Sequence, residues 1–520
     1  MSDEDRLPRL PLSPTAATAW LIGVSAALHV LLATSVGLGV GEAYYFGAIR
    51  HLSPGYFDQP PASAFLAWLA VHLAGTTSDF VLRAPFILLF AATTWLTFLI
   101  GRGLFSPWAG FWAAVLVSVA PVFTISTAIF YQPEGPLMLG WAATLYLLAP
   151  LVLVEAPVTA AGRKWLAAGV MLGVTLLGKY TAVFLVFGTV LYLLVNGDRH
   201  RWLRRREPYF ALLAALVCFT PVLLWNAHHD WISLQWQGER GVAFHGIRLD
   251  WLLKNVGGQL IEILPWIWLP LIVEPLRAFR SAPPQRAPRI FLACVGGPPI
   301  LAFTAVAAYG NIGNHFHWAA PGYLTLLIAL GATIDRWIAR RPLPALAAVG
   351  AMLLATVAFV SVMLVQAVTG RFSEGNGALA RWLQGGNDAT VELINLDALV
   401  PAFRSRGLLG RPDLFVFSDR WYLGGKVDYA FKGTMPFLLL NDSDPREYAF
   451  FDSPSHYVGK EGILVSERDS LAAVERDYGP YCSALDSMGS VPIIRGSRVE
   501  RTLYLYRCAA LTHAYPVPYH

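Results

Sequence analysis

The chain of 520 residues is 55% hydrophobic and only 14% charged, and its mean hydropathy is +0.49. Because a soluble globular protein carries about 25% charged residues, this composition excludes an ordinary soluble enzyme and indicates a membrane protein. The net charge of +5 does not indicate nucleic-acid binding, since the arginines fall between apolar runs, where membrane topology explains them.

Apolar runs recur along the first two thirds of the chain, most of them long enough to cross a hydrocarbon core of about 30 Å. We predict about eleven spans, with up to thirteen allowed, because two short runs flank Lys179. The predicted spans are residues 15–40, 81–101, 108–129, 135–154, 165–178, 180–195, 208–225, 251–273, 290–309, 318–334 and 343–365. The predicted fold class is therefore an all-α polytopic membrane protein, with a small domain added at its C-terminal end.

Basic residues gather in alternate gaps between the spans, at residues 163–164, 199–206, 277–289 and 336–341. The positive-inside rule places these gaps in the cytoplasm. Residues 1–11 are then expected to be cytoplasmic and show no cleavable signal pattern, and an odd span count puts the chain after Val365 outside. The extracytoplasmic side receives the first loop (residues 41–80), Glu134, Lys179 and the loops at residues 226–241 and 311–318.

The first external loop begins with GEAYYFGAIRHLSPGYFDQPP, residues 41–61. Its carboxylates lie next to a predicted span and among tyrosines. Residues 62–75 continue as an apolar stretch that is too short to span comfortably, so we predict a helix along the membrane interface.

The last third of the chain has mixed charge and many turn residues. Strand-like runs occupy residues 414–418, 436–441, 462–466 and 502–508, and helix-like patterns occupy residues 377–383 and 466–478. Alternating strands and helices predict a small α/β domain. We therefore expect a membrane module over residues 1–370 and an extracytoplasmic α/β domain over residues 371–520.

Two of the four cysteines, Cys218 and Cys294, fall in predicted spans and are expected to be packing residues. Cys482 and Cys508 fall in the exported domain, where a disulfide is permitted. Two free thiols at these positions are the open alternative.

Several motifs together resemble a known family. The stretch GEAYYF…LSPGYFDQPPASAFLAWL resembles the first external loop of bacterial glycosyltransferases related to protein O-mannosyltransferases and to the lipid A aminoarabinose transferase. The resemblance continues at YQPEGPLMLGW (131–141), LLGKYTAVFL (176–185), PVLLWNAHHDWISLQWQ (221–237) and HFHWAAPGYL (315–324). FVFSDRWYLGGKVDYAFKG (415–433) resembles the exported domain of the family.

The resemblance implies a GT-C membrane glycosyltransferase in the bacterial inner membrane. Such an enzyme moves a sugar, with inversion, from a polyprenyl-phosphate donor to an exported lipid, glycan or protein acceptor. The alternative is a protein without chemistry, either a catalytically silent relative or a binder or transporter of lipid-linked sugars. A transport path would place polar groups within the spans, whereas here the polar residues gather outside them.

Inverting transfer needs a carboxylate to accept a proton and cations to hold the departing phosphate. The candidate catalytic residues are Glu42, Asp58 and Glu134, and the candidate phosphate ligands are Lys179 and Arg240. The expected substrate pocket contains Tyr44, Tyr45, Tyr56, Gln59 and His315.

Each of these residues also has a plainer interpretation. Helix capping explains Glu42 and Glu134, a turn explains Asp58, and snorkelling to the interface explains Lys179. Arg240 could be a solvated loop charge, and the tyrosines could be interfacial anchors.

Two positions depart from the family pattern. Gly41 stands where the family commonly has Asp, and Gln59 stands where it commonly has His or Lys. If Gly41 occupies the usual base position, Glu42 takes over its task, the acceptor needs less activation, or the chain is inactive. His315 and His317 could ligate a divalent metal, but two histidines at this spacing are weak support, and the sequence establishes no cofactor with certainty.

Overall fold

The computed structural model describes residues 12–153, 160–242, 244, 246–310 and 315–519. The N-terminal segment expected in the cytoplasm, residues 1–11, and residues 311–314 of a predicted external loop lie outside this range. The chain divides into two compact units. The first comprises Met1–Leu31, Gln59–Ser63 and Ala84–Val360, and the second comprises Leu32–Asp58, Ala64–Arg83 and Ser361–His520. Most of the first external loop thus belongs to the same unit as the C-terminal domain.

Each predicted span is helical over most of its length. The helices are α1 (Pro14–Ser35), α4 (Asp79–Leu104), α5 (Pro107–Val119), α6 (Glu134–Leu153), α7 (Ala161–Gly178), α8 (Val183–Val195), α9 (Glu207–His228), α11 (Leu249–Ile263), α12 (Pro265–Ile272), α14 (Arg286–Ala307), α15 (Ala320–Arg340) and α16 (Pro342–Thr369). Among the described residues, seven helices are long and apolar enough to cross a membrane, or eight if one bent pair counts as a span. The chain is thus a multi-pass membrane protein, and the count of eleven stays a prediction.

The segment predicted as one continuous span, residues 251–273, is instead a bent pair of helices. The axis turns by 109° between α11 and the stretch of α12 and α13 (Glu274–Arg280). The break lies at Leu264, whose φ of 71° is outside the helical region, and Pro265 follows at the first position of α12. Proline disfavours helical backbone in the residue before it, so the Leu-Pro pair explains the break that the span prediction missed.

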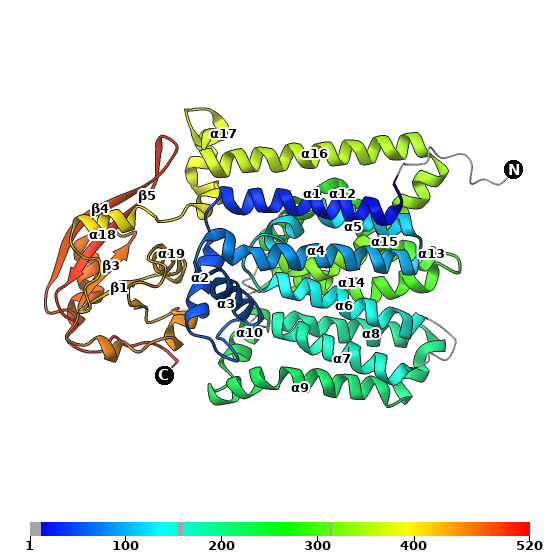
Figure 1. Ribbon diagram of the computed structural model, residues 1–520, viewed down its shortest axis with the longest axis horizontal. Helices are drawn as coiled ribbons and strands as arrows, with labels where there is room; N and C mark the ends of the chain where they lie inside the picture. The colour runs from blue at the N-terminus through cyan, green and yellow to red at the C-terminus, as the bar shows by residue number, and fades with distance from the viewer. Residues whose placement is uncertain (1–11, 154–159, 243, 245, 311–314, 520) are drawn as a thin grey trace. The chain divides into compact units, whose positions relative to one another are not determined.

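Helix α7 packs against both α6 and α9 (Figure 1). Small residues allow these close approaches, as is common between membrane helices. A Cβ atom at Gly169 would lie 2.1 Å from the carbonyl oxygen of Ala211 in α9, and one at Gly140 would lie 2.4 Å from Oγ1 of Thr175 in α7. The three helices therefore form a tightly packed group within the first unit.

The second unit contains a five-stranded sheet in the order β2-β1-β3-β5-β4. The strands are β1 (Leu414–Ser418), β2 (Phe437–Leu439), β3 (Glu461–Ser466), β4 (Leu485–Arg495) and β5 (Arg498–Cys508). Strand β1 runs parallel to β2 and β3, whereas β5 runs antiparallel to β3 and β4. The small α/β domain expected from the sequence is confirmed.

Helices cover both faces of this sheet because side chains along β1 and β3 alternate between two apolar cores. One core joins Val416 and Ile463 to α18 (Leu399–Ser405), α19 (Trp421–Ala430) and α2 (Val40–Arg50). The other joins Phe417 and Leu464 to α20 (Leu471–Tyr478). Shorter helices are α3 (Ala62–Ala74), α10 (Ile232–Val242) and α17 (Ala378–Trp382). Helix α2 of the first loop is thus part of the C-terminal domain core.

The sequence predicted four of the strands and missed β4. This edge strand contains Gly489 and Pro492, and its pairing with β5 is irregular between Ser487 and Ser490. Both residue types weaken a strand pattern, which explains the omission. A disulfide joins Cys482 to Cys508, so the structure adopts the bridged alternative.

Candidate functional site

Glu134 and Lys179 are brought together by the way α6 begins and α7 ends. A π-helical segment (η2, Val122–Thr127) follows α5, and the chain then turns so that Glu134 opens α6. At the end of α7, a Cβ atom on Gly178 would lie only 3.0 Å from the backbone nitrogen of Leu137. Because α7 ends so close to the first turn of α6, the next residue, Lys179, lies beside Glu134.

A buried ion pair forms the centre of this site. The Lys179 ammonium donates a hydrogen bond to Oε1 of Glu134, and the two side chains are only 7% and 4% exposed. His317 Nε2 lies 3.6 Å from the same carboxylate oxygen. A carboxylate and an ammonium are thus held side by side, away from water, at one end of the helices.

A second cation, Arg240 of α10, joins this group through aromatic side chains. An Arg240 N–H donates to Nε2 of His315 at 2.7 Å. Its guanidinium carbon lies 4.3 Å from the ring centre of Trp236 and 4.8 Å from that of Trp318, while Lys179 lies 5.6 Å from Trp318. Trp318 therefore contacts two cations through cation–π interactions, and the site offers two positive groups to an anionic ligand.

A second carboxyl group, Glu262 of α11, lies near enough to Glu134 for the two groups to repel each other. Its Oε2 atom is buried and has no hydrogen-bond partner among the described residues. Next to it in α11, Gln259 donates to Asn255 at 2.6 Å and to Thr304 at 2.9 Å. This polar stretch makes Glu262 a further candidate site residue.

Four predicted site residues from distant segments thus meet in the first unit: Glu134, Lys179, Arg240 and His315. Gln59 is buried in the same unit, and its Oε1 lacks a hydrogen-bond partner among the described residues. Sequence reasoning missed Trp236, Trp318 and Glu262. Glu262 was a detectable signal, because it is a lone carboxylate within an apolar run.

Glu42 lies in the second unit, where its carboxylate is fully engaged. Its Oε2 accepts from the backbone N–H of Gly39 at 2.7 Å, and its two oxygens accept from Arg83 at 2.8 and 2.6 Å. Both side chains of the pair are 0% exposed. The remaining Arg83 N–H groups donate to the carbonyl oxygens of Ala33, Val36 and Gly37. These contacts favour the capping interpretation of Glu42, and no sequence pattern indicated Arg83 as its partner.

Asp58 also lies in the second unit, beside another buried carboxyl group, Glu447. Asp58 is 4% exposed and Glu447 is 2% exposed. Burial, together with the charge of Asp58 and a hydrogen bond to it, raises the pKa of Glu447 well above its usual range. Glu447 therefore keeps its proton more strongly than an exposed glutamate does, because a second buried negative charge at this place is unfavourable.

Stability of the second unit should decline as the pH rises, because folding keeps Glu447 protonated. An acid whose pKa is higher in the folded state stabilises the fold most at a pH below its unfolded pKa, which is about 4.3 for Glu. This stabilisation is lost progressively as the pH rises from the unfolded pKa to the folded pKa. The free energy of unfolding should then fall by up to about 1.4 kcal/mol per pH unit.

Glu447→Gln keeps the shape of the side chain but has no titrating proton. The thermal unfolding temperature of this variant, measured on the full-length protein, should therefore depend less on pH between pH 5 and 8 than that of the wild type. Glu475→Gln, on an exposed position, is the control. Equal slopes for wild type and Glu447→Gln would contradict the raised pKa of Glu447.

The tyrosines predicted for a substrate pocket are packed into the second unit. The Tyr44 hydroxyl accepts from the backbone N–H of Glu447 at 3.2 Å, and its ring centre lies 5.4 Å from Trp421 and 5.1 Å from Tyr45. The Tyr56 hydroxyl donates to the carbonyl oxygen of Ala48 at 3.1 Å. These contacts hold the first loop in place, and a role of these residues in sugar binding stays a prediction.

Among the described residues, no group of three or more His, Cys, Asp or Glu side chains is arranged to hold a metal ion. His315 and His317 lie near each other, with ring centres 6.2 Å apart. His315 accepts a hydrogen bond from Arg240 and packs on Trp318, and His317 lies beside Glu134.

Comparison with known proteins identifies relatives of the membrane part. Residues 58–225 match the family model described as dolichyl-phosphate-mannose-protein mannosyltransferase. The lipid A galacturonosyltransferase RgtD of Rhizobium johnstonii is 23% identical over 301 residues, which are 57% of this chain and 61% of that protein. The chain thus spans about three fifths of the length of this curated relative, and the family resemblance inferred from the motifs is confirmed.

Solved structures confirm the fold class. ArnT from Cupriavidus metallidurans bound to undecaprenyl phosphate aligns with a TM-score of 0.64 at 13% identity, covering 94% of this chain and 98% of that chain. The archaeal oligosaccharyltransferase AglB from Archaeoglobus fulgidus, in complex with an inhibitory peptide and a dolichol-phosphate, aligns with a TM-score of 0.50 at 13% identity, covering 86% and 69%. At these identities the likeness shows the fold alone.

Proposed function

We propose that this protein is a membrane glycosyltransferase of the GT-C type. It would move a sugar, with inversion, from a polyprenyl-phosphate donor to an exported lipid, glycan or protein acceptor. The observation that carries this proposal is the buried pair of Glu134 and Lys179, which Trp318 links to the half-buried Arg240. It combines a carboxylate for the acceptor proton with two cations for the phosphate that departs.

The ion pair between Glu134 and Lys179 provides a way to couple donor binding to base activation. A donor phosphate that binds Lys179 competes with Glu134 for the ammonium. The released carboxylate can then take the proton of the acceptor hydroxyl. As the acceptor oxygen bonds to the anomeric carbon, the bond from that carbon to the phosphate oxygen breaks, and polyprenyl phosphate leaves with the extra negative charge. Lys179 and Arg240 face that charge.

The connectivity of the helices supports the expected orientation. The cluster lies where α6 begins and α7 ends, whereas the basic gaps follow α8 and α15 and precede α7 and α14. Those gaps therefore lie at the other end of the helices, which the positive-inside rule assigns to the cytoplasm. We infer a cluster at the outer face of the bacterial inner membrane. A topology reporter fused after Arg206 should read cytoplasmic, and an exported signal there would overturn this orientation.

The direct test is release of the lipid carrier. Purified full-length protein should release polyprenyl phosphate from a labelled polyprenyl-phosphate sugar when an acceptor is present. Because one relative is a lipid A galacturonosyltransferase, the first pair to try is polyprenyl-phosphate galacturonic acid as donor and lipid A as acceptor. Neutral hexose and pentose donors follow. Failure of all donor classes, with each donor nevertheless bound, would favour the catalytically silent alternative.

That silent alternative has specific support. Gly41 replaces the acid that the family commonly has, and the neighbouring Glu42 carboxylate is fully occupied by Arg83 and the backbone. A silent relative would bind the lipid-linked sugar through Lys179 and Arg240 without transferring it. Binding without release of polyprenyl phosphate distinguishes this function from the first.

A further inference from the structure

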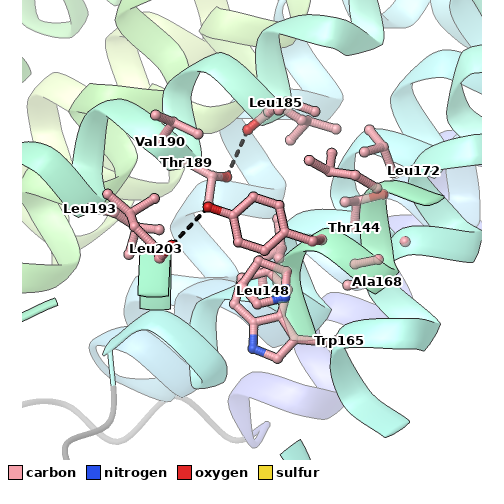
Figure 2. Close-up of a pocket in the computed structure, with 16 residues that line it drawn as sticks. Thr144, Leu148, Trp165, Ala168, Leu172, Leu185, Thr189, Val190, Leu193 and Leu203 are labelled. Carbon is pink, nitrogen blue, oxygen red and sulfur yellow. Dashed lines mark hydrogen bonds between the residues drawn. The ribbon is translucent and has the colours of Figure 1, made fainter. Parts of the chain in front are cut away.

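A cavity separate from the candidate site lies among α6, α7, α8 and α9 (Figure 2). It has a volume of about 290 Å³ and is lined almost wholly by apolar side chains, among them Leu148, Leu172, Leu185 and Leu193. Its size is close to the lower end for small-molecule pockets, about 300 Å³. Such a space inside a membrane protein suits a hydrocarbon chain.

Much of the cavity lies in the half of the helices nearer the basic gaps, where Trp165, Leu193 and Pro208 line it. Its lining residues Thr144 and Leu148 follow Glu134 in α6 by 10 and 14 positions. At a rise of 1.5 Å per residue they lie about 15 to 21 Å along the helix from that carboxylate. The lining contains none of the cluster residues Glu134, Lys179, Arg240 and Trp318, so the cavity is separate from that cluster.

The cavity opens sideways toward the surrounding lipid. Val190 of α8 and Tyr209 and Leu212 of α9 line it, and they are 39%, 56% and 37% exposed. The Tyr209 hydroxyl donates to the carbonyl oxygen of Leu203 at 2.7 Å, which fixes the phenol ring as part of the wall. A chain could thus enter between α8 and α9 from within the bilayer.

Two buried indole groups supply hydrogen-bond donors next to the apolar lining. Trp165 lines the cavity, and the ring of Trp202 lies 5.3 Å from it. Each tryptophan is only 4% exposed, and neither indole N–H has a hydrogen-bond partner among the described residues. Burying an N–H without an acceptor is unfavourable, so these donors indicate a ligand that brings oxygen atoms.

Positive charge borders the same cavity. Arg163 and Lys164 directly precede Trp165, and Arg204 and Arg206 lie in the short connection between the lining residues Leu203 and Pro208. All four cations are exposed. The nearby carboxylate of Glu207 is bound by Arg205. Basic pockets between helices on the cytoplasmic side are suited to anionic lipid head groups.

We propose that this cavity binds an anionic phospholipid, with one acyl chain between α8 and α9. The phosphate would lie at the rim formed by Arg204 and Arg206, and the ester oxygens would accept from the indole N–H groups. This lipid comes from the leaflet opposite the candidate site and is distinct from the proposed donor. The proposal does not depend on glycosyltransferase activity.

Native mass spectrometry of the delipidated full-length protein tests this site directly. Added phosphatidylglycerol should bind in preference to phosphatidylcholine with the same acyl chains. Ala168→Phe, which fills the cavity from α7, should weaken phosphatidylglycerol binding about tenfold or more, since it displaces two or three methylene groups. Ala167→Phe is the matched control, because Ala167 is exposed next to it on the same helix. The control should bind phosphatidylglycerol like the wild type.

The head-group contribution is tested by a second pair of variants that leave the cavity unfilled. The double variant Arg204→Gln/Arg206→Gln should show about tenfold less preference for phosphatidylglycerol. The control is the double variant Arg340→Gln/Arg341→Gln, at another basic gap, which should keep the wild-type preference. Equal binding of both phospholipids to the wild type would overturn the proposal, as would unchanged binding by Ala168→Phe. A competition experiment adds equimolar polyprenyl phosphate to protein with bound phosphatidylglycerol. If polyprenyl phosphate displaces phosphatidylglycerol from the wild type but not from Ala168→Phe, the cavity binds the donor lipid instead.

Discussion

Replacing Lys179 by methionine is expected to lower kcat/KM for the lipid-linked donor about 10²-fold. The ammonium is the group that the donor phosphate would bind, and a hydrogen bond to a charged group contributes about 1.5–3 kcal/mol. Its contribution should be larger in the transition state, because the phosphate gains charge as it leaves. Donor binding should therefore weaken, and turnover at saturating donor should fall as well. The release of labelled polyprenyl phosphate measures both quantities.

Two further variants separate the charge of Lys179 from its position. Lys179→Arg keeps the charge but replaces a point charge by a planar fork, so activity should be only partly retained. Lys164→Met removes an exposed lysine at the other end of α7 and should leave donor turnover unchanged. If Lys179→Met keeps wild-type donor affinity and turnover, Lys179 is an interfacial anchor and the phosphate is bound elsewhere.

The membrane cluster could be predicted because its residues stand out in the sequence. Glu134 and Lys179 are charged residues at the edges of apolar runs, and Arg240 lies in a loop between two such runs; the positions of the runs follow from hydropathy alone. Alternating spans return these residues to the same side of the membrane, where they are able to meet. The cation–π contacts with Trp318 could not be predicted in this way, because one tryptophan among many at the membrane edge carries no distinguishing pattern.

The environment of the first-loop carboxylates could not be predicted from local sequence. Glu42 is paired with Arg83, which lies 41 residues further along the chain, and Asp58 is paired with Glu447 of the C-terminal domain. Such partners are set by tertiary packing, which leaves no periodic trace in the sequence. A carboxylate that looks available in a motif can therefore be fully engaged in the fold, as Glu42 is.

Glu134→Gln should lower turnover about 10²–10⁴-fold, the usual contribution of a general base. The amide keeps the shape of the side chain but cannot accept the acceptor proton as a carboxylate does. Donor binding should survive, because Lys179 and Arg240 remain. A fall in turnover with donor affinity kept or increased would identify Glu134 as the base, since the variant also removes the carboxylate that competes with the donor for Lys179. Turnover equal to that of the wild type would move the base role to Asp58.

Glu42→Gln should act differently, by weakening the fold. The substitution leaves the buried guanidinium of Arg83 without its counter-charge, and breaking a buried pair from one side costs about 3–5 kcal/mol. The expected result is a lower unfolding temperature and less folded protein, with turnover per folded molecule nearly unchanged. Asp79→Asn, at a half-buried carboxylate that accepts from Asn395, is a control with a smaller expected loss of stability.

Gly41→Asp decides between the two proposed functions, because it restores the acid that the family commonly has. If Glu134 already acts as the base, a second carboxylate next to Glu42 should change turnover little. If the natural chain is a silent binder, the restored acid should produce release of polyprenyl phosphate where the parent shows none. Combining Gly41→Asp with Glu134→Gln sharpens the test, since activity rescued in the double variant would place the base role at position 41 and leave Glu134 as the partner that positions Lys179.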